Sequence, residues 1–257
     1  MGFLEIRSLT KYFGGLAAVH RLDLNVVQSQ IFGLIGPNGA GKSTVLNMID
    51  GTLRPSYGVI TFNGESITRL PAHEHARRGI GRVFQENALF SGLTVIQNVR
   101  VGYHLSSRID PLGLFVNTVS HRKRENLLQE KALEILRFVG LSDQVNERAI
   151  NLPHGRQRLL CLAIALATGP KLLLLDEPLT GMNAEEIKEM LRKIREIKEE
   201  QGVTCIIIEH NLRAVMGLCD WLAVLNFGEK IAEGPPGEVV KNPAVVEAYL
   251  GTEDAIV

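Results

Sequence analysis

Residues 36–43 combine glycines with a lysine and a serine in the spacing GxxxxGK[ST], which is typical of phosphate-binding loops. Glycines let successive backbone N–H groups converge on phosphate oxygens, and the N-terminus of a following helix adds partial positive charge. We expect Lys42 to contact the β- and γ-phosphates of a nucleoside triphosphate and the Ser43 hydroxyl to ligate Mg²⁺. The alternative is a glycine turn with a surface lysine. The expected nucleotide contacts in this stretch are Gly36, Pro37, Asn38, Gly39, Ala40, Gly41, Lys42, Ser43 and Thr44.

Two carboxylates, Asp176 and Glu177, follow the unbroken apolar run 172–175. Such a run is typical of a strand buried on both faces, and α/β sheets place their ligands beyond the carboxyl ends of such strands. We expect Asp176 to hold the Mg²⁺ shell and Glu177 to polarise an attacking water as general base. An acidic pair that merely caps a strand is the alternative. The combination with a phosphate loop favours the hydrolytic role.

The elements that must position these residues form a parallel α/β core. Continuous apolar runs at 31–35, 171–175 and 203–208 predict buried parallel strands. Residues 183–200 carry one apolar stripe at helical spacing, which predicts a helix between the last two of those strands. Hairpins are predicted at Asn63-Gly64 after a strand at 58–62 and at Phe227-Gly228, and short helices at the C-terminal end.

Residues 91–158 have a different pattern. The segment 126–139 is amphipathic at helical spacing, and no strand-like run interrupts the region. We therefore expect a helical subdomain inserted into the core, with residues 106–119 as its connecting loop. The expected organisation is one domain over 1–257, in which 1–90 and 159–257 form the core.

Composition excludes several other classes of protein. Lys plus Arg equals Asp plus Glu at 28 each, so no overall basic field attracts nucleic acid or anionic lipid. The three cysteines lack CxxC spacing, which argues against a zinc site or a disulfide framework. The apolar runs are far shorter than the roughly 20 residues that span a bilayer. Any role at a membrane is therefore expected to depend on a partner.

Together, the phosphate loop, the run Asp176-Glu177-Pro178 and His210 after an apolar run resemble the nucleotide-binding domain of ABC transporters. The resemblance covers essentially the whole chain. It implies a P-loop NTPase of the α/β class, with a RecA-like parallel-sheet core, an N-terminal antiparallel β subdomain and an inserted helical subdomain. It also implies ATP and Mg²⁺ as cofactors and ATP hydrolysis coupled to transport.

The resemblance assigns roles to residues outside the phosphate loop. Gln85 matches the glutamine that touches Mg²⁺ and the attacking water, so that Ser43, Gln85 and Asp176 would surround the metal. His210 matches the histidine that contacts the γ-phosphate, and the implied catalytic residues are Glu177, His210 and Gln85. Phe13 matches the aromatic residue that stacks on adenine.

Three stretches resemble, more narrowly, the ATP-binding subunits of branched-chain amino acid importers. They read Phe13-Gly-Gly-Leu-Ala-Ala-Val, Gln85-Glu-Asn-Ala-Leu-Phe with Leu93-Thr-Val-Ile-Gln-Asn-Val, and Ile231-Ala-Glu-Gly-Pro. Importers of urea and short amides use closely similar subunits. The implied cargo is therefore a branched-chain amino acid or a related small amino acid or amide.

The family signature LSGGQ is altered here. The corresponding residues are Leu152 followed by Pro153, His154, Gly155 and Arg156. In the family this helix start clamps the ATP bound by the opposite subunit, but proline has neither a hydroxyl nor an N–H. Arg156 is a candidate for a substitute charge. The loss of donors predicts a weakened signature and favours a heterodimer over a homodimer.

The implied partners are a second ABC ATPase subunit, transmembrane permease subunits and, indirectly, a substrate-binding protein. The expected location is the cytoplasmic face of the inner or plasma membrane, reached through the permease. A second hypothesis is a nucleotide-gated binding module whose altered signature does not support hydrolysis in the facing site. A third, a soluble ATPase of DNA repair or translation, is disfavoured because the chain has neither long coiled coils nor a second cassette.

Overall fold

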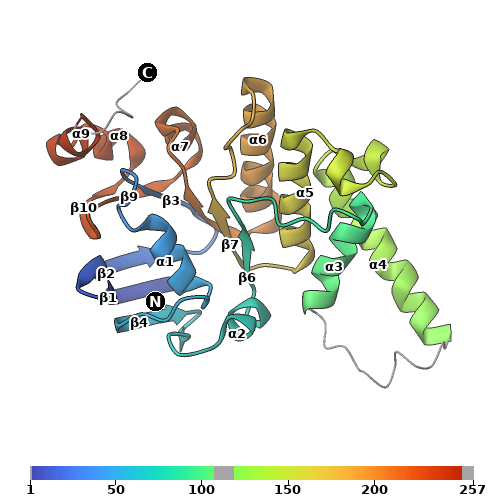
Figure 1. The fold of residues 1–257 in the computed structure, drawn as a ribbon, viewed down its shortest axis with the longest axis horizontal. Coiled ribbons are helices and arrows are strands. Elements are labelled where there is room, and N and C mark those ends of the chain that lie inside the picture. Colours follow the sequence, from blue (N-terminus) through green and yellow to red (C-terminus); the bar gives the residue numbers. More distant parts are fainter. Residues whose placement is uncertain (1, 107–118, 251–257) are drawn as a thin grey trace.

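The computed structural model describes residues 2–106 and 119–250, in which strands and helices alternate around two sheets (Figure 1). The strands are β1 (Leu4–Phe13), β2 (Leu16–Val26), β3 (Ile31–Ile35), β4 (Tyr57–Phe62), β5 (Glu65–Ser66), β6 (Ile80–Val83), β7 (Leu172–Asp176), β8 (Thr204–Ile208), β9 (Trp221–Asn226) and β10 (Glu229–Gly234). The helices are α1 (Lys42–Ile49), α2 (Ala72–Arg77), α3 (Val95–Ser106), α4 (Val119–Phe138), α5 (His154–Ala167), α6 (Ala184–Gln201), α7 (Leu212–Leu218), α8 (Pro236–Val239) and α9 (Pro243–Leu250), with short 3₁₀ turns at Ser142–Gln144 and Ala149–Asn151.

The larger sheet has six strands in the order β10-β9-β3-β8-β7-β6, and all neighbours are parallel except β10 and β9. Side chains alternate between its faces: Leu173 and Leu175 join one apolar cluster, and Leu172 and Leu174 join the other. Every residue of β3, β7 and β8 is buried. The parallel core with both faces covered, as expected from the unbroken apolar runs, is confirmed.

The smaller sheet is antiparallel, with strand order β2-β1-β4-β5. Its apolar side chains share one cluster with α1 and with one face of the larger sheet, so the β subdomain packs beside the helix that follows the phosphate loop. The turn between β4 and β5 is formed by Asn63 and Gly64, which both have positive φ angles, 49° and 81°. This backbone suits a two-residue hairpin and confirms the predicted turn.

The helices α3 and α4, drawn in green, stand apart from the smaller sheet in Figure 1 and pack with α5. Helix α3 approaches α5 closely, because a Cβ added at Gly102 would lie 2.5 Å from the Ile164 carbonyl oxygen. The predicted helix at 126–139 is present as part of α4. Residues 107–118 of the expected connecting loop lie outside the described residues. The expected subdomain boundary at residue 158 falls inside α5, which runs through it without a break.

Several ends of elements follow directly from residue type. Helix α6 begins with a reciprocal capping box between Asn183 and Glu186 and ends at Gly202 in the left-handed conformation.

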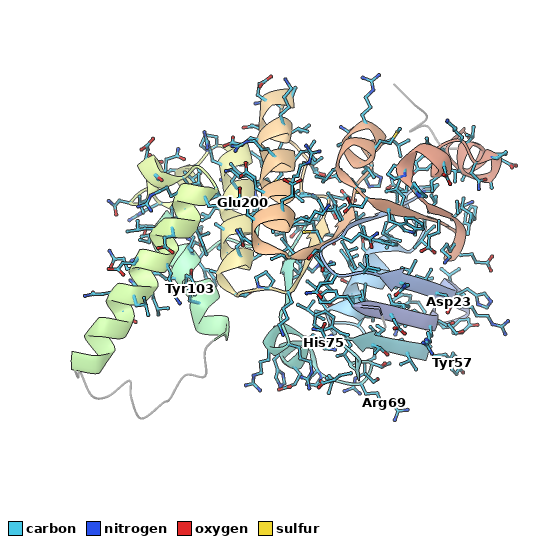
Figure 2. All side chains as sticks on the ribbon, turned by 180° about the vertical axis from the view of Figure 1, so that it is seen from behind. Asp23, Tyr57, Arg69, His75, Tyr103 and Glu200 are labelled. Carbon is cyan, nitrogen blue, oxygen red and sulfur yellow. The ribbon has the colours of Figure 1, made fainter. Side chains whose placement is uncertain are left out.

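His75 of α2, labelled in Figure 2, is buried, and its Nδ1 lies 2.8 Å from the Ile49 carbonyl oxygen at the end of α1. This contact ties α2 to the phosphate-loop helix. Within the described residues, no helix has the length and apolarity needed to span a membrane.

Candidate nucleotide-binding and hydrolysis site

The phosphate loop connects the buried strand β3 to α1. Gly36 and Gly41 have positive φ angles of 147° and 99°, and a Cβ at either would lie within 2.3 Å of a carbonyl oxygen, that of Leu225 or of Ala18. Both positions therefore require glycine because backbone elsewhere in the fold approaches too closely for any side chain. The loop is thus held between the start of β2 and the end of β9.

Lys42 is the first residue of α1 and is 5% exposed. Its Nζ donates hydrogen bonds to the Gly36 and Pro37 carbonyl oxygens, at 2.7 and 2.9 Å. The ammonium therefore lies over its own loop, where triphosphate oxygens would replace the carbonyls as acceptors. Ser43 and Thr44 follow in the first turn of the helix, beside its N-terminus.

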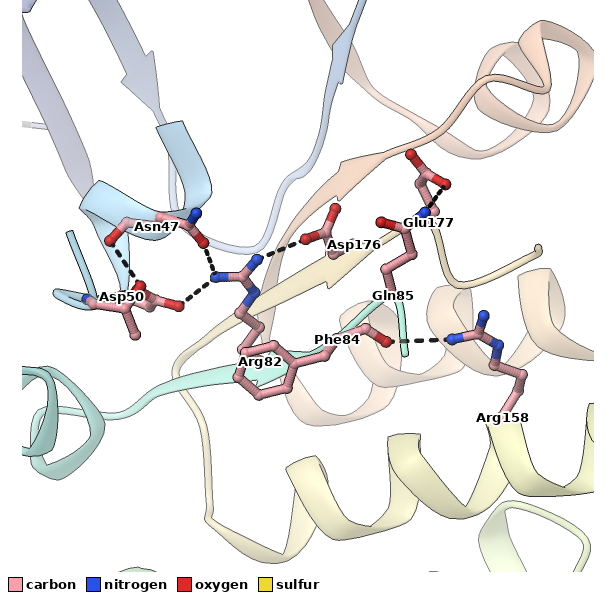
Figure 3. A network of polar contacts seen from close by, with 9 residues as sticks. Asn47, Asp50, Arg82, Phe84, Gln85, Arg158, Asp176 and Glu177 are labelled. Atoms are coloured by element: carbon pink, nitrogen blue, oxygen red, sulfur yellow. Dashed lines mark hydrogen bonds and ion pairs between the residues drawn. The ribbon is translucent and has the colours of Figure 1, made fainter. Parts of the chain in front are cut away.

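Asp176 is the last residue of β7 and is 4% exposed. Its Oδ2 accepts a 2.6 Å hydrogen bond from Arg82 Nη2, and its Oδ1 is buried without a hydrogen-bond partner (Figure 3). A buried carboxylate oxygen without a donor is costly unless something else completes its coordination. Asp176 Oδ1, the Ser43 hydroxyl and the Gln85 amide oxygen are all oxygen donors, and this chemistry fits Mg²⁺, a metal that prefers oxygen ligands.

The Glu177 carboxylate contacts the other residues expected to act in hydrolysis. Gln85 Nε2 donates to Glu177 Oε2 at 3.0 Å, and His210 Nε2 lies 2.8 Å from Glu177 Oε1. The Thr180 hydroxyl lies 3.4 Å from Oε2. The side chains of Glu177 and His210 are 15% and 36% exposed, so the group lies at a partly open surface. Two residues distant in sequence, Gln85 and His210, are therefore brought together around one carboxylate.

The backbone of Glu177 is itself unusual. Its φ angle is 48°, in the left-handed region, and its N–H donates to the Ile208 carbonyl oxygen at 3.0 Å. A non-glycine residue held there typically costs about 1–3 kcal/mol, and such strain is concentrated at functional sites. After this bend the Glu177 side chain meets Gln85, while Asp176 meets Arg82 (Figure 3). His210 contacts the other oxygen of the Glu177 carboxylate.

Glu209 is a buried carboxylate that sequence reasoning missed. Its Oε1 accepts from the Leu179 N–H at 2.8 Å and its Oε2 from the His210 N–H at 3.3 Å. Burial raises the pKa of the Glu209 carboxyl above its usual value, and the two backbone N–H groups offset part of that rise. Glu209 thus joins the segment after Glu177 to the segment that carries His210.

Phe13 ends β1 and is 50% exposed, with Lys11 Nζ 5.2 Å from its ring centre. The neighbouring Tyr12 packs edge-on against Tyr57, with ring centres 6.3 Å apart. Phe13 is therefore the more exposed ring of the two, and its stacking on a base stays a prediction. Its hairpin partner β2 passes the phosphate loop at Ala18, whose carbonyl oxygen limits Gly41.

The altered signature lies at the start of α5. Pro153 is the N-cap residue and makes no side-chain capping bond. The His154 ring lies against Gly181, where an added Cβ would come within 2.8 Å of it, and Gly155 lies against the Glu186 carboxylate. Arg156 Nη1 donates to the Gly140 carbonyl oxygen at 3.0 Å and lies 3.6 Å from Glu189. The guanidinium is thus held by its own subunit.

The signature and the phosphate loop belong to opposite faces of the larger sheet. Apolar residues of α5, such as Leu159 and Leu160, pack in the cluster on one face, whereas Val45 and Leu46 of α1 pack in the cluster on the other. Residue 157 links α5 instead to the segment after Gln85: Asn87 Nδ2 donates to Gln157 Oε1 at 3.0 Å. The two halves of the expected ATP clamp therefore do not meet within one chain.

Arg82 is the second residue that sequence reasoning missed. It lies on β6 between Gly81 and Val83, and its guanidinium reaches Asn47, Asp50 and Asp176. The available signal was a charged residue inside an otherwise apolar strand that runs into Gln85. The partners of Arg82 could not be read from spacing, because they lie 32 to 94 positions away.

Comparisons with known proteins identify the family of this chain. The ABC transporter family model matches residues 19–180, and a model described as branched-chain amino acid ATP-binding cassette transporter matches residues 229–255. The chain is 39% identical to the high-affinity branched-chain amino acid transport ATP-binding protein BraF of Pseudomonas aeruginosa, over 96% of this chain and 97% of that protein. It is 38% identical to LivG of Escherichia coli, which carries the same description, over the same shares of the two chains.

Solved structures show the same fold. A nucleotide-free ATP-binding cassette from an ABC transporter is 32% identical with a TM-score of 0.86, covering 98% of this chain and 100% of that one. The ADP conformation of an ATP-binding cassette of an ABC transporter gives a TM-score of 0.85 at the same identity and coverage. With the phosphate loop, the Asp176-Glu177 pair and the histidine and glutamine around Glu177 in place, the chain belongs to the ABC transporter family, as an ATP-binding cassette.

Proposed function

We propose that this protein is the ATP-binding and hydrolysing subunit of an ABC importer for branched-chain amino acids or a related small amino acid or amide. The observation that carries the proposal is the convergence of Gln85 and His210 on Glu177, directly after the buried Asp176. The names of the relatives with 38–39% identity over nearly the whole chain support the choice of cargo.

ATP would lie along the phosphate loop, with its base against Phe13. Lys42 would exchange its two carbonyl acceptors for β- and γ-phosphate oxygens, and the start of α1 would add its dipole. The Ser43 hydroxyl, Asp176 Oδ1 and the Gln85 amide oxygen would hold Mg²⁺, which neutralises charge on the phosphates. The metal-binding atom of Gln85 is its oxygen because its nitrogen donates to Glu177.

Hydrolysis would use Glu177 as general base. The carboxylate accepts a proton from the attacking water as the new bond to the γ-phosphorus forms and the bond to ADP breaks. His210 and Gln85 fix the two carboxylate oxygens, so the base does not have to be ordered at the moment of reaction. The resemblance also assigns His210 a contact with the γ-phosphate.

Two cassettes would complete each site. Because the signature and the phosphate loop lie on opposite faces of the larger sheet, a signature can close on ATP only from a second subunit. The pairing is therefore head to tail, with ATP between the subunits. Pro153 reduces the donors at this helix start, and the engagement of Arg156 with Gly140 and Glu189 removes the simplest substitute. These contacts favour a heterodimer whose two sites are unequal.

Restoring serine at position 153 and glycine at position 154 should raise the turnover of the assembled ATPase. Each charge-assisted hydrogen bond to phosphate contributes about 1.5–3 kcal/mol, so one regained donor corresponds to roughly 10-fold or more at the weaker site. The assay is phosphate release by the assembled transporter, with Arg192→Ala on α6 as a surface control. Unchanged turnover, with both sites of the parent transporter already hydrolysing equally, would show that the variant signature works as it stands.

The permease contact is proposed at Gln85 and the segment 86–99. Phe84 and Phe90 are 45% and 52% exposed, whereas Leu89 packs against the core. The Asn98 side chain holds this segment through hydrogen bonds with the backbone N–H and carbonyl oxygen of Phe90. The Phe90 ring itself is exposed. The exposed aromatic side chains thus lie beside a glutamine that contacts the general base. The chain would be held at the cytoplasmic face of the membrane through this contact.

The cargo is tested by uptake into vesicles that hold the assembled transporter and its binding protein. We expect ATP-dependent uptake of radiolabelled leucine, with unlabelled isoleucine and valine as competitors and glutamate as a matched non-competitor. Competition by urea or short amides alone would place the protein with the amide importers. ATP-independent uptake, or none, would argue against the importer assignment and favour the nucleotide-gated module that the altered signature suggests.

A further inference from the structure

Arg82 makes an unusually dense set of contacts for one buried side chain. Its Nη1 donates to Asn47 Oδ1 at 2.6 Å and to Asp50 Oδ2 at 2.5 Å, and its Nη2 donates to Asp176 Oδ2 at 2.6 Å (Figure 3). The side chains of Arg82, Asp50 and Asp176 are only 8%, 10% and 5% exposed. The planar fork of a guanidinium is suited to bridging two carboxylates in this way.

The contacts join three parts of the nucleotide site. Asn47 belongs to α1, and Asp50 directly follows it, where Asp50 Oδ1 is itself held by the N–H and hydroxyl of Thr52. Asp176 ends β7. Arg82 lies on β6, in register with Leu174, and the same strand leads into Gln85 three residues later. One guanidinium therefore connects the end of the phosphate-loop helix, the metal-site aspartate and the strand that carries Gln85.

The carboxylate of Asp176 is held on one side only. Arg82 is the donor to its Oδ2, while Oδ1 has no hydrogen-bond partner. A single strong bond to one oxygen restrains the rotation of the carboxylate and leaves the lone pairs of the other, buried oxygen unused. Asp50 restrains Arg82 from the far side, so the guanidinium is not free to turn and take both oxygens of Asp176. This arrangement presents Oδ1 in a fixed direction.

We propose that Arg82 is a positioning residue of the magnesium site, which orients Asp176 Oδ1 toward the metal and is itself held in place by Asn47 and Asp50. The inference rests on the proposed function, because it takes Asp176 as a metal ligand. Groups that orient metal ligands typically contribute 10–100-fold to metal affinity. A role in stability alone would instead affect nucleotide binding with and without metal equally.

The test is the affinity for ADP, measured by calorimetry in Mg²⁺ and again in EDTA. In Arg82→Met we expect the gain in affinity due to Mg²⁺ to fall about 10–100-fold while the affinity in EDTA stays near that of the parent protein. Arg82→Lys keeps the charge but loses the fork, so it should lie between the two. Arg78→Met is the matched control, since Arg78 is an ion-paired arginine directly after α2 whose partners are Glu74 and Glu65.

Each outcome decides the question. The inference would be overturned if Mg²⁺ still raised the ADP affinity of Arg82→Met as much as that of the parent protein. It would also be overturned if the variant lost ADP affinity equally in Mg²⁺ and in EDTA. If Arg82→Met does not fold, Arg82→Lys carries the same comparison, and an unchanged Mg²⁺ gain in that variant contradicts the positioning role. If the parent protein binds ADP equally in Mg²⁺ and EDTA, the proposed magnesium site itself is wrong, which is distinguishable from a failure of Arg82 alone.

Discussion

Replacing Glu177 by glutamine should lower the turnover of ATP about 10²–10⁴-fold, which is the usual contribution of a positioned general base. The amide keeps the size of the side chain and retains an oxygen acceptor for Gln85 or His210, but it cannot accept the proton of the attacking water. ATP binding should persist, because Lys42 and the phosphate loop are unchanged. The Glu177→Gln variant is therefore expected to bind ATP without hydrolysing it at a normal rate.

Steady-state phosphate release by the partnered variant measures this effect, with ATP affinity determined in parallel. Glu200→Gln is a suitable control, because Glu200 is an exposed carboxylate at the C-terminal end of α6, whereas Glu177 precedes the N-terminal end of the same helix. Near-normal hydrolysis by the Glu177 variant would remove Glu177 from the role of base. Loss of ATP binding in the same variant would show that the substitution acts through structure instead.

Replacing Lys42 by alanine should weaken ATP binding about 10- to 150-fold. A charge-assisted hydrogen bond contributes about 1.5–3 kcal/mol, and every 1.4 kcal/mol changes a dissociation constant tenfold. Lys42 is suited to this role because its buried ammonium already lies against the Gly36 and Pro37 carbonyl oxygens. Lys42 is expected to contact only the phosphates of the nucleotide, so the affinity for adenosine should be unchanged.

Calorimetric titration with ATP and with adenosine separates these two expectations. Lys188→Ala is the matched control, since Lys188 is an exposed lysine of α6 with 73% of its side chain accessible. Because alanine also removes the two hydrogen bonds to the loop, the unfolding temperature of each variant should be compared. Unchanged ATP affinity in a folded Lys42 variant would contradict the phosphate role.

The parts of the fold that sequence predicts best are those fixed by local pattern. Unbroken apolar runs identified β3, β7 and β8, because a strand buried on both faces has no polar side to alternate with. The hairpin at Asn63 and Gly64 follows from residues that accept positive φ. The subdomain boundary was less well defined, since α5 continues through it and nothing in a helix marks where its packing partners change.

The site shows a similar division. The phosphate loop is readable because all its residues are contiguous, and the resemblance to a family supplied Gln85 and His210. That both side chains contact Glu177 is a result of the fold. Arg82 and Glu209 were missed because their roles depend on hydrogen-bond partners on other elements. A single sequence does not reveal which distant groups share a hydrogen bond.

The contacts of Arg156 and Leu89 also needed the structure. Arg156 looks from sequence like a replacement charge for the lost serine, yet its guanidinium contacts Gly140 and Glu189 of the same chain. Leu89 and Phe90 are neighbouring apolar residues, yet Leu89 packs against the core and Phe90 is exposed. In both cases a chain segment distant in sequence decides what the side chain touches.

ATP hydrolysis at Glu177 is expected to power transport. The most direct measurement is phosphate release by the assembled transporter in vesicles, with and without cargo-loaded binding protein, while uptake is followed in the same vesicles. We predict that cargo raises phosphate release, that uptake follows it, and that Glu177→Gln abolishes both. A rate of phosphate release that is the same with and without cargo would contradict this coupling of hydrolysis to transport. Uptake at the normal rate in the Glu177 variant would contradict it as well.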